Sequence, residues 1–224
     1  MIILKSKSYS NLLKNITPLI VIIILSACIK ARVAVPENNP ENWLLAFVDV
    51  ETTGLKPGYH EMIDIGVILS DLEGKEIGRT FLRIMPAHPE RAAQGAIEIN
   101  GFSIKRWKKL GALQPSKAVD SLIRFHKKLA KEKNILLVAY NSQFDAAFLD
   151  HLFRSADKNW RDIYYYYVLD IPSMAWSRGI RLLHGKKLSE YFGIPDEPHT
   201  PTEHTGITGA DLNYRLYKKI INRK

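Results

Sequence analysis

The sequence predicts an α/β domain built on one mixed sheet with helices on both faces, and three observations predict it. A continuous apolar run at residues 43–50 is typical of a buried strand. Two segments with alternating polarity follow at residues 61–71 and 75–85, separated by a turn at Gly74. Helical periodicity then alternates with short apolar runs, which indicates helix and strand units. The expected sheet therefore has three antiparallel strands followed by parallel strands.

The later elements are expected from spacing and from start and stop signals. Apolar residues recur at helical spacing from residue 118 to 130, behind the start signal Pro115-Ser116. A glycine at position 193 is placed to end a short helix. The remaining elements are predicted, in order, at residues 134–140 (strand), 144–153 (helix), 163–169 (tyrosine-rich strand), 187–192 (helix) and 210–221 (helix).

Composition narrows the class of protein. The 224 residues are 46% hydrophobic and 25% charged, which excludes a wholly disordered, collagenous or multi-span membrane chain. A formal charge of +9 favours polyanionic partners such as nucleic acid or an anionic membrane surface. The only cysteine, Cys28, excludes an intramolecular disulfide and a zinc site with several thiolates.

The first 28 residues have the order of a signal peptide. Lysines without acidic residues come first, then the apolar run at residues 19–25, then small residues before Cys28. Residues 25–28, Leu-Ser-Ala-Cys, resemble the lipobox of bacterial lipoproteins, which implies a lipid anchor on Cys28 and a place in the bacterial cell envelope. A short uncleaved anchor and a cytoplasmic protein are the alternatives. Residues 1–28 are thus predicted to be a signal peptide, residues 29–42 a flexible tether, and residues 43–224 the folded domain.

Two acids stand at the end of the first strand. Asp49 and Glu51 are two positions apart, so in an extended strand their side chains project to the same face. Paired buried carboxylates repel each other unless a cation lies between them, and hard oxygen ligands suit Mg²⁺ or Mn²⁺. The alternative is a strand end whose acids reach solvent or a lysine.

Further acids are expected near the same edge of the sheet. Asp145 follows the strand at residues 134–140, in the first turn of the next helix, and Asp211 opens the last predicted helix. Each could instead be a helix N-terminal acid that interacts with the helix dipole. Three acidic sites at three element boundaries are more than capping predicts.

These residues carry a family resemblance. The segment from Asp49 through Glu51-Thr52-Thr53-Gly54 to Leu55, and the later set Asn141, Phe144 and Asp145, resemble the first two motifs of the DEDDh branch of the DnaQ-like exonuclease superfamily. The resemblance implies a ribonuclease H-like fold and covers nearly all of residues 43–224. Tyr140 replaces the histidine often found before the asparagine.

The third motif departs from the family pattern. In the family a histidine precedes the last aspartate by one to one and a half helical turns, but Gly206 holds the corresponding place before Asp211. His204 and His199 lie seven and twelve positions before Asp211. We expect His204 to be the general base, with a bulge or loop over residues 205–209 bringing it inward, because a group titrating near neutrality is needed.

The resemblance implies a 3′–5′ exonuclease that hydrolyses single-stranded DNA or RNA to nucleoside 5′-monophosphates. Two divalent ions, Mg²⁺ or Mn²⁺, would be held by four carboxylates. Substrate would contact the turn after the first strand and the second motif. The implied metal ligands are Asp49, Glu51, Asp145 and Asp211, and the implied substrate contacts are Thr52, Thr53, Gly54, Leu55 and Asn141.

Two further expectations remain open. The basic segment at residues 105–109 either follows the phosphates of a single strand or forms a solvated helix face with Trp107 packed inward. Because the third motif is irregular, the alternative function is a nucleic-acid-binding module of the same fold with impaired catalysis.

Overall fold

The computed structural model describes residues 36–223, so Cys28 and the predicted signal peptide lie outside the described residues. Residues from Pro40 onward form one compact unit. The helices are α2 (Gln94–Asn100), α3 (Ile104–Lys109), α4 (Pro115–Ala130), α5 (Ser142–Arg154), α6 (Ile171–Ser177), α7 (Gly185–Phe192) and α8 (Gly206–Ile221), with single 3₁₀ turns at Pro40–Asn42, Pro89–Arg91 and Trp160–Asp162. The strands are β1 (Trp43–Thr52), β2 (Met62–Ser70), β3 (Glu76–Arg83), β4 (Asn134–Ala139) and β5 (Val168–Asp170).

The predicted mixed sheet is confirmed. Its strand order is β3-β2-β1-β4-β5; β1, β2 and β3 pair antiparallel, and β4 and β5 run parallel to β1. The central strand β1 is therefore flanked by one neighbour of each kind. β1 begins at Trp43, where the folded domain was expected, although a 3₁₀ turn at Pro40–Asn42 occupies part of the predicted tether. The predicted boundaries as a whole stay predictions.

Two predicted elements differ from those observed. The tyrosine-rich strand predicted at residues 163–169 is reduced to the short strand β5. Among the tyrosines before β5, only Tyr165 donates a backbone hydrogen bond to β4, to the carbonyl of Ile135. Its neighbour Tyr164 is buried against α4 and α5 instead. The last helix begins at Gly206 rather than at residue 210, because Thr205 and Thr208 form a reciprocal capping box there.

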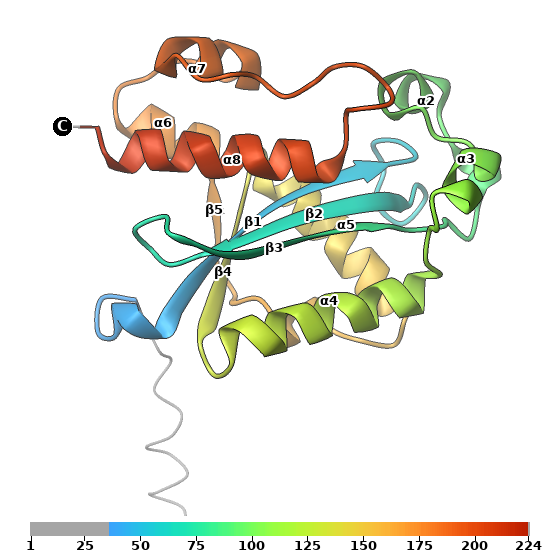
Figure 1. Ribbon diagram of the computed structural model, residues 1–224, viewed down its shortest axis with the longest axis horizontal. Helices are drawn as coiled ribbons and strands as arrows, with labels where there is room; N and C mark the ends of the chain where they lie inside the picture. The colour runs from blue at the N-terminus through green and yellow to red at the C-terminus, as the bar shows by residue number, and fades with distance from the viewer. Residues whose placement is uncertain (1–35, 224) are drawn as a thin grey trace, which may run out of the picture. The chain divides into compact units, whose positions relative to one another are not determined.

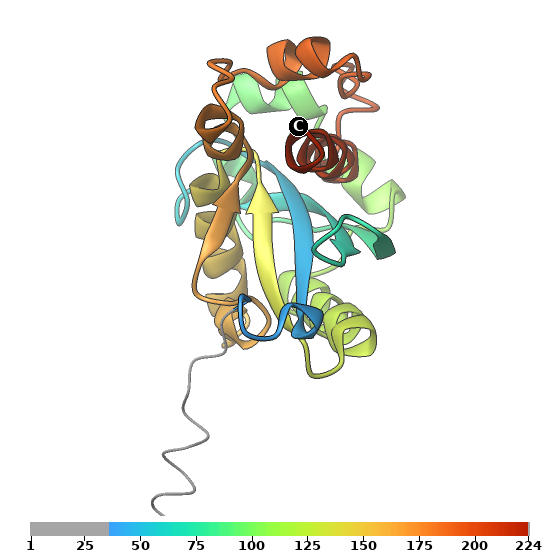
Figure 2. The same ribbon diagram turned by 90° about the vertical axis from the view of Figure 1, so that its left-hand side faces the viewer.

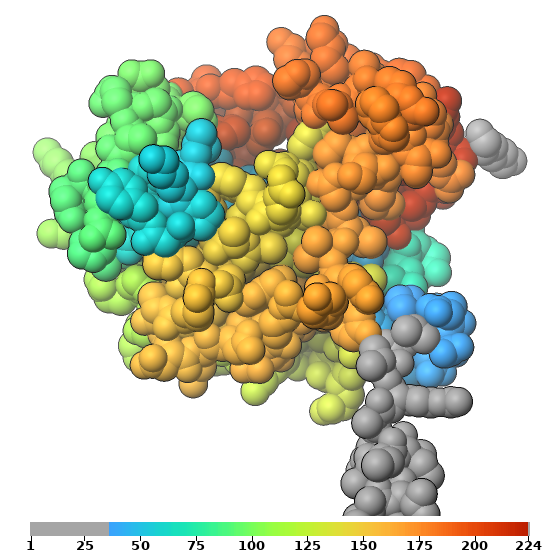
Figure 3. Space-filling view, turned by 180° about the vertical axis from the view of Figure 1, so that it is seen from behind, coloured from blue at the N-terminus to red at the C-terminus, as the bar shows by residue number. Residues whose placement is uncertain are grey.

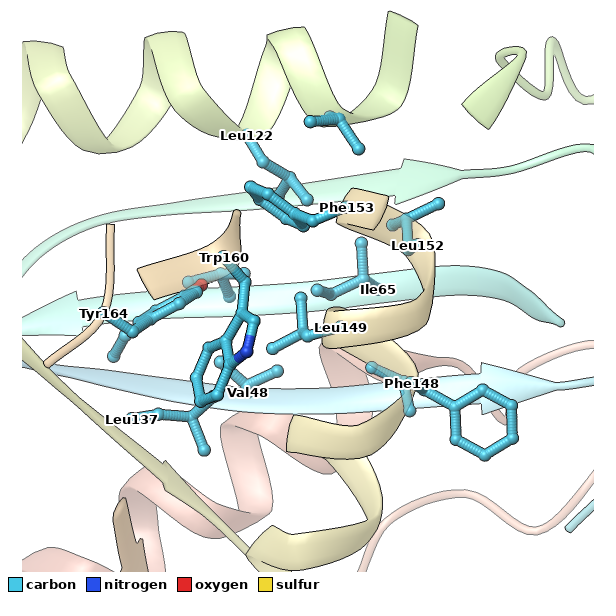
Figure 4. Packing of buried hydrophobic residues seen from close by; sticks show 14 of the residues in the cluster. Val48, Ile65, Leu122, Leu137, Phe148, Leu149, Leu152, Phe153, Trp160 and Tyr164 are labelled. Carbon is cyan, nitrogen blue, oxygen red and sulfur yellow. The ribbon is translucent and has the colours of Figure 1, made fainter. Parts of the chain in front are cut away.

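Helices cover both faces of the sheet, as the hydrophobic pattern predicts. Helices α6, α7 and α8 lie on one face and α4 and α5 on the other (Figures 1 and 2). Even-numbered residues of β1, such as Val48, pack under α4 and α5, whereas odd-numbered ones, such as Phe47, pack under α8. Figure 4 shows the first core, where Phe148, Leu149 and neighbouring side chains of α5 meet the sheet.

The loops that follow the functional motifs gather at one end of the sheet. The turn after β1, the α2–α3 segment and the start of α5 lie side by side on the surface (Figure 3). A backbone hydrogen bond from Ala93 to Thr53, 2.7 Å long, joins the first two of these. None of the helices within residues 36–223 is long and apolar enough to cross a bilayer.

Candidate active site

The end of β1 directs two carboxylates toward α8. Asp49 and Glu51 continue the odd-numbered row that packs under α8, so the strand period sets their direction. The strand register shifts between Glu51 and Thr52, and such an irregularity changes the direction of side chains at the end of a strand. Both acids line one pocket of about 630 Å³.

Asp145 joins them from the neighbouring strand–helix unit. β4 runs parallel to β1, and the chain after it turns at Asn141 in a left-handed conformation (φ 62°) into α5. This turn places Asp145 in the first helical turn with only 2% of its surface exposed. The structure therefore brings three of the four predicted acids together.

The electrostatics show that the three acids interact. Burial raises the pKa of Asp49 well above its ordinary value, and the charges of Asp145 and Glu51 raise it further. Burial also raises the pKa of Asp145, with the charge of Glu51 among the further causes. Because the charges of these carboxylates destabilise one another, a cation between them would stabilise their ionised forms.

His204 reaches the cluster from the loop before α8. Its Nε2 lies 2.9 Å from Glu51 Oε1, and its Nδ1 lies 3.0 Å from the carbonyl oxygen of Pro198. The hydrogen bond to Glu51 raises the pKa of His204 to about 9. His199, the other candidate base, pairs with Asp196 at 2.8 Å and keeps 61% of its side chain exposed. The structure thus brings His204, and not His199, to Glu51; its role as a base stays a prediction.

Asp211 does not join the cluster, and the expectation that it faces the other acids is corrected. Its carboxylate forms salt bridges with Arg79 (3.2 Å) and Arg215 (2.8 Å) and does not line the pocket. No bulge interrupts residues 206–211, because α8 already begins at Gly206. The helix residue that faces Asp49 is Gly209, and Asp211, two positions later, is rotated by roughly 200° about the helix axis.

The predicted substrate residues divide into two groups. Thr52, Gly54 and Leu55 line the pocket with the acids, and the Leu55 side chain is 80% exposed. Thr53 is buried, and its hydroxyl accepts a hydrogen bond from the Glu61 amide. Asn141 is exposed and does not line the pocket.

Gly54 permits another group to approach its backbone closely, and that group is the His60 side chain of the protein itself. A Cβ at this position would lie 2.6 Å from the His60 ring. His60 in turn accepts a hydrogen bond from the Lys56 amide at 3.0 Å. The turn after β1 is therefore closed by His60 and requires glycine at position 54.

Three site residues were not predicted from the sequence. Glu197 lines the pocket from the loop before α8, Asn100 donates to the Thr52 carbonyl (3.0 Å), and Arg106 donates to the carbonyls of Gly101 (2.8 Å) and Pro201 (3.0 Å). Arg106 thereby ties the loop that carries His204 to the α2–α3 segment. An acid, an amide and an arginine in loops or short helices show no periodicity, so only the basic segment at residues 105–109 offered a signal.

The basic segment takes the structural alternative at Trp107. The indole is buried, and its Nε1 donates to the Ile63 carbonyl at 2.8 Å. Trp107 is buried and Arg106 is engaged with backbone carbonyls, so the exposed cations of this segment are its lysines.

The side chains of the cluster suit a hard divalent cation, but they include only three of the four predicted acids. Three carboxylates with no thiolate suit Mg²⁺ or Mn²⁺. Within residues 36–223, no set of three or more histidine, cysteine, aspartate or glutamate side chains is close enough, as placed, to hold an ion. Asp49, Glu51 and Asp145 therefore fit an ion by chemistry and location, and Asp211 does not.

Comparison with known proteins gives the family. The family described as Exonuclease, RNase T, matches residues 46–217, which is more than half of the chain. The chain is 27% identical to the 3′-5′ DNA exonuclease Cap18 of Escherichia coli over 110 residues, covering 47% of this chain and 54% of the relative.

Solved structures support the fold. Exonuclease I of E. coli in complex with a 5cy-dT13 oligonucleotide superposes with a TM-score of 0.64 at 15% identity, and exonuclease I of Methylocaldum szegediense with a TM-score of 0.64 at 19% identity. Each match covers 81% of this chain and 41% of the other, so the chain spans about half or less of the length of these proteins. The family resemblance and the ribonuclease H-like fold are thus confirmed, and the chain belongs to the 3′–5′ exonuclease family of RNase T.

Proposed function

We propose that the chain is a divalent-metal-dependent exonuclease that removes nucleotides from the 3′ end of single-stranded nucleic acid. The observation that carries this proposal is that Asp49, Glu51 and His204 line one pocket beside the exposed Leu55, with the buried Asp145 close enough to interact with both acids. Relatives support the substrate class, since one is named a DNA exonuclease and another was solved with an oligonucleotide of thymidines. Single-stranded DNA is therefore the first substrate to assay, with RNA beside it.

The proposed chemistry assigns a task to each group. Asp49, Glu51 and Asp145 would hold the divalent cation that proteins of this family use, and a bound cation supplies an activated water and stabilises the leaving 3′-oxygen. His204 would take the proton of the attacking water. At neutral pH it is protonated while it pairs with Glu51, so it becomes a proton acceptor only when that contact is weakened and its pKa falls.

The pocket geometry gives the terminal nucleotide a place to bind. Leu55 projects from the turn after β1, and Phe144 lines the same pocket from α5. Between them, the last base would meet apolar surface while its phosphate faces the acids. Asn100 fixes the Thr52 carbonyl and lies 3.5 Å from Glu51 Oε2, which holds the turn against the site.

The experiment compares Asp49→Asn with Asp211→Asn on a 3′-labelled single strand in Mn²⁺ or Mg²⁺. Asparagine keeps the volume of aspartate and removes its charge, so the first variant should lose at least about 100-fold in rate, since metal-ligand contacts contribute several kcal/mol to the transition state. The second should hydrolyse like the wild type, because Asp211 lies outside the pocket. Wild-type rates in Asp49→Asn, with contaminating nuclease excluded, would refute the proposal.

A second candidate function is 3′-end binding without efficient turnover. It is favoured by one observation, that Asp211 is engaged by Arg79 and Arg215 and only three of the four family acids gather. The two candidates differ in a single assay: a binding module retains the labelled strand at the pocket and releases no mononucleotide in either metal.

The place of action rests on the sequence. We infer that Cys28 is lipidated and anchors the chain to the bacterial cell envelope, because the basic start, the apolar run and the Leu-Ser-Ala-Cys segment occur in processing order. Cys28→Ser should then release the protein from the membrane fraction. An intact mass that begins at Met1 in the membrane-bound protein would contradict lipidation.

A further inference from the structure

The position of the family's last acid is held by a glycine. Counted forward from His204, one to one and a half helical turns reach residues 208 and 209. The Thr208 hydroxyl is used in the capping box of α8. A Cβ on Gly209 would lie 2.4 Å from both Cγ and Oδ2 of Asp49. Gly209 therefore lies against the Asp49 carboxylate, where a side chain of the third motif would meet the other acids.

Another carboxylate is present on this side of the pocket. Glu197, in the loop between α7 and α8, lines the pocket together with Asp49, Glu51 and His204. Its Oε2 atom is inaccessible to solvent and accepts no hydrogen bond. The nearest cationic atom is His204 Nδ1 at 3.7 Å, which already has the Pro198 carbonyl as its hydrogen-bond partner. A buried carboxylate oxygen without a hydrogen-bond partner is costly, and a bound cation would remove that cost.

Glu197 also interacts with the acids of the cluster. Burial raises the pKa of Glu197; the charge of His204 lowers it, and the charge of Glu51 raises it. The charge of Glu197 is in turn among the causes that raise the pKa of Asp49. Asp211 instead forms salt bridges with Arg79 and Arg215. Of the two acids near the start of α8, Glu197 is the one that lines the pocket and has a carboxylate oxygen without a hydrogen-bond partner.

We propose that Glu197 supplies the fourth carboxylate of this site, in place of the family's last aspartate, whose position in the third motif is occupied here by Gly209. This inference rests on the proposed function for the identity of the site, but it concerns cation binding and not turnover. A carboxylate on the longer glutamate side chain, brought in by the loop before α8, would complete a second cation position that Asp49, Glu51 and Asp145 do not complete alone.

The test measures Mn²⁺ binding to the full chain by electron paramagnetic resonance of free Mn²⁺, with thymidine 5′-monophosphate present. The wild type should bind two ions. Glu197→Gln should bind one, or bind the second at least 10-fold more weakly, while the matched control Asp211→Asn should bind two with wild-type affinity. Circular dichroism and thermal unfolding confirm that each variant is folded.

The outcomes separate this inference from the proposed function. Retention of both ions by Glu197→Gln within 2-fold, binding of a single ion by the wild type, or loss of the second ion in Asp211→Asn would each overturn it. Retained Mn²⁺ binding with a shifted pH profile of activity in Glu197→Gln would assign Glu197 to positioning His204, which also overturns it. Two ions in the wild type and one in Glu197→Gln, without any hydrolysis, would support the inference and refute the exonuclease proposal.

Discussion

Replacing Gly209 by alanine tests the contact between α8 and the acidic cluster. The added methyl group would lie 2.4 Å from the Asp49 carboxylate, well inside van der Waals contact, so Asp49 or the helix has to move. Overpacking of this kind costs roughly 1–3 kcal/mol. Alanine in a helix interior gains about 1 kcal/mol over glycine. The free energy of unfolding should therefore fall by about 1 kcal/mol, although helix propensity alone predicts a rise.

Gly95→Ala is the matched control. Gly95 is also helical, in α2, and a Cβ there would meet no atom within 4 Å. This variant should be as stable as the wild type or up to about 1 kcal/mol more stable. Urea unfolding of the metal-free proteins at one pH measures both changes. A Gly209→Ala variant as stable as Gly95→Ala, with wild-type Mn²⁺ affinity, would refute the close contact between Gly209 and Asp49.

Three further predictions concern single residues. Burial raises the pKa of Asp64 to about 7 from an ordinary value near 3.8, so the folded state binds this proton more tightly than the unfolded state. The contribution of Asp64 to the free energy of unfolding therefore falls as the pH rises from about 4 to 7, by about 4 kcal/mol at most. Asp64→Asn should remove that part of the pH dependence, measured by urea unfolding at pH 5 and pH 8. An equal pH dependence in both proteins would show that Asp64 titrates normally. Arg106→Lys should lose the hydrogen bonds that tie Pro201 to Gly101, which lowers the free energy of unfolding by about 1–3 kcal/mol. Amide exchange in residues 196–204 should then become faster. Unchanged exchange would mean that other contacts hold the loop. Leu55→Ala should raise KM for a single-stranded 3′ end by about 5- to 30-fold, because about 1–2 kcal/mol of apolar contact is lost. Its thermal stability should stay unchanged because the side chain is exposed. An unchanged KM would place the terminal base elsewhere.

Most of the fold follows from local patterns in the sequence. The run from Trp43 to Val50 predicts a buried central strand, and the alternation of β2 and β3 predicts their antiparallel pairing. The tyrosine-rich segment was predicted as a longer strand because aromatic residues favour strands, but pairing depends on tertiary contacts that propensity does not contain. The start of α8 was missed because two glycines lower the helix propensity of its first turns.

The site was predictable where it follows the strand period and not where it depends on helix rotation or loops. Asp49 and Glu51 share a face because strands have a period of two, and Asp145 follows from the parallel β4–α5 unit. Asp211 was misplaced because α8 places Gly209 against Asp49, and a residue two positions further along a helix points to another face. Glu197 and Arg106 reach the site through loops whose path no periodicity encodes.

A crystal structure with Mn²⁺ and thymidine 5′-monophosphate tests the central claim most directly, because it shows the ligands of the ion and the position of the nucleotide together. The account predicts anomalous density beside Asp49, Glu51 and Asp145, the phosphate toward these acids, and the base against Leu55. Manganese or nucleotide bound away from this pocket, with His204 still paired to Glu51, would contradict it.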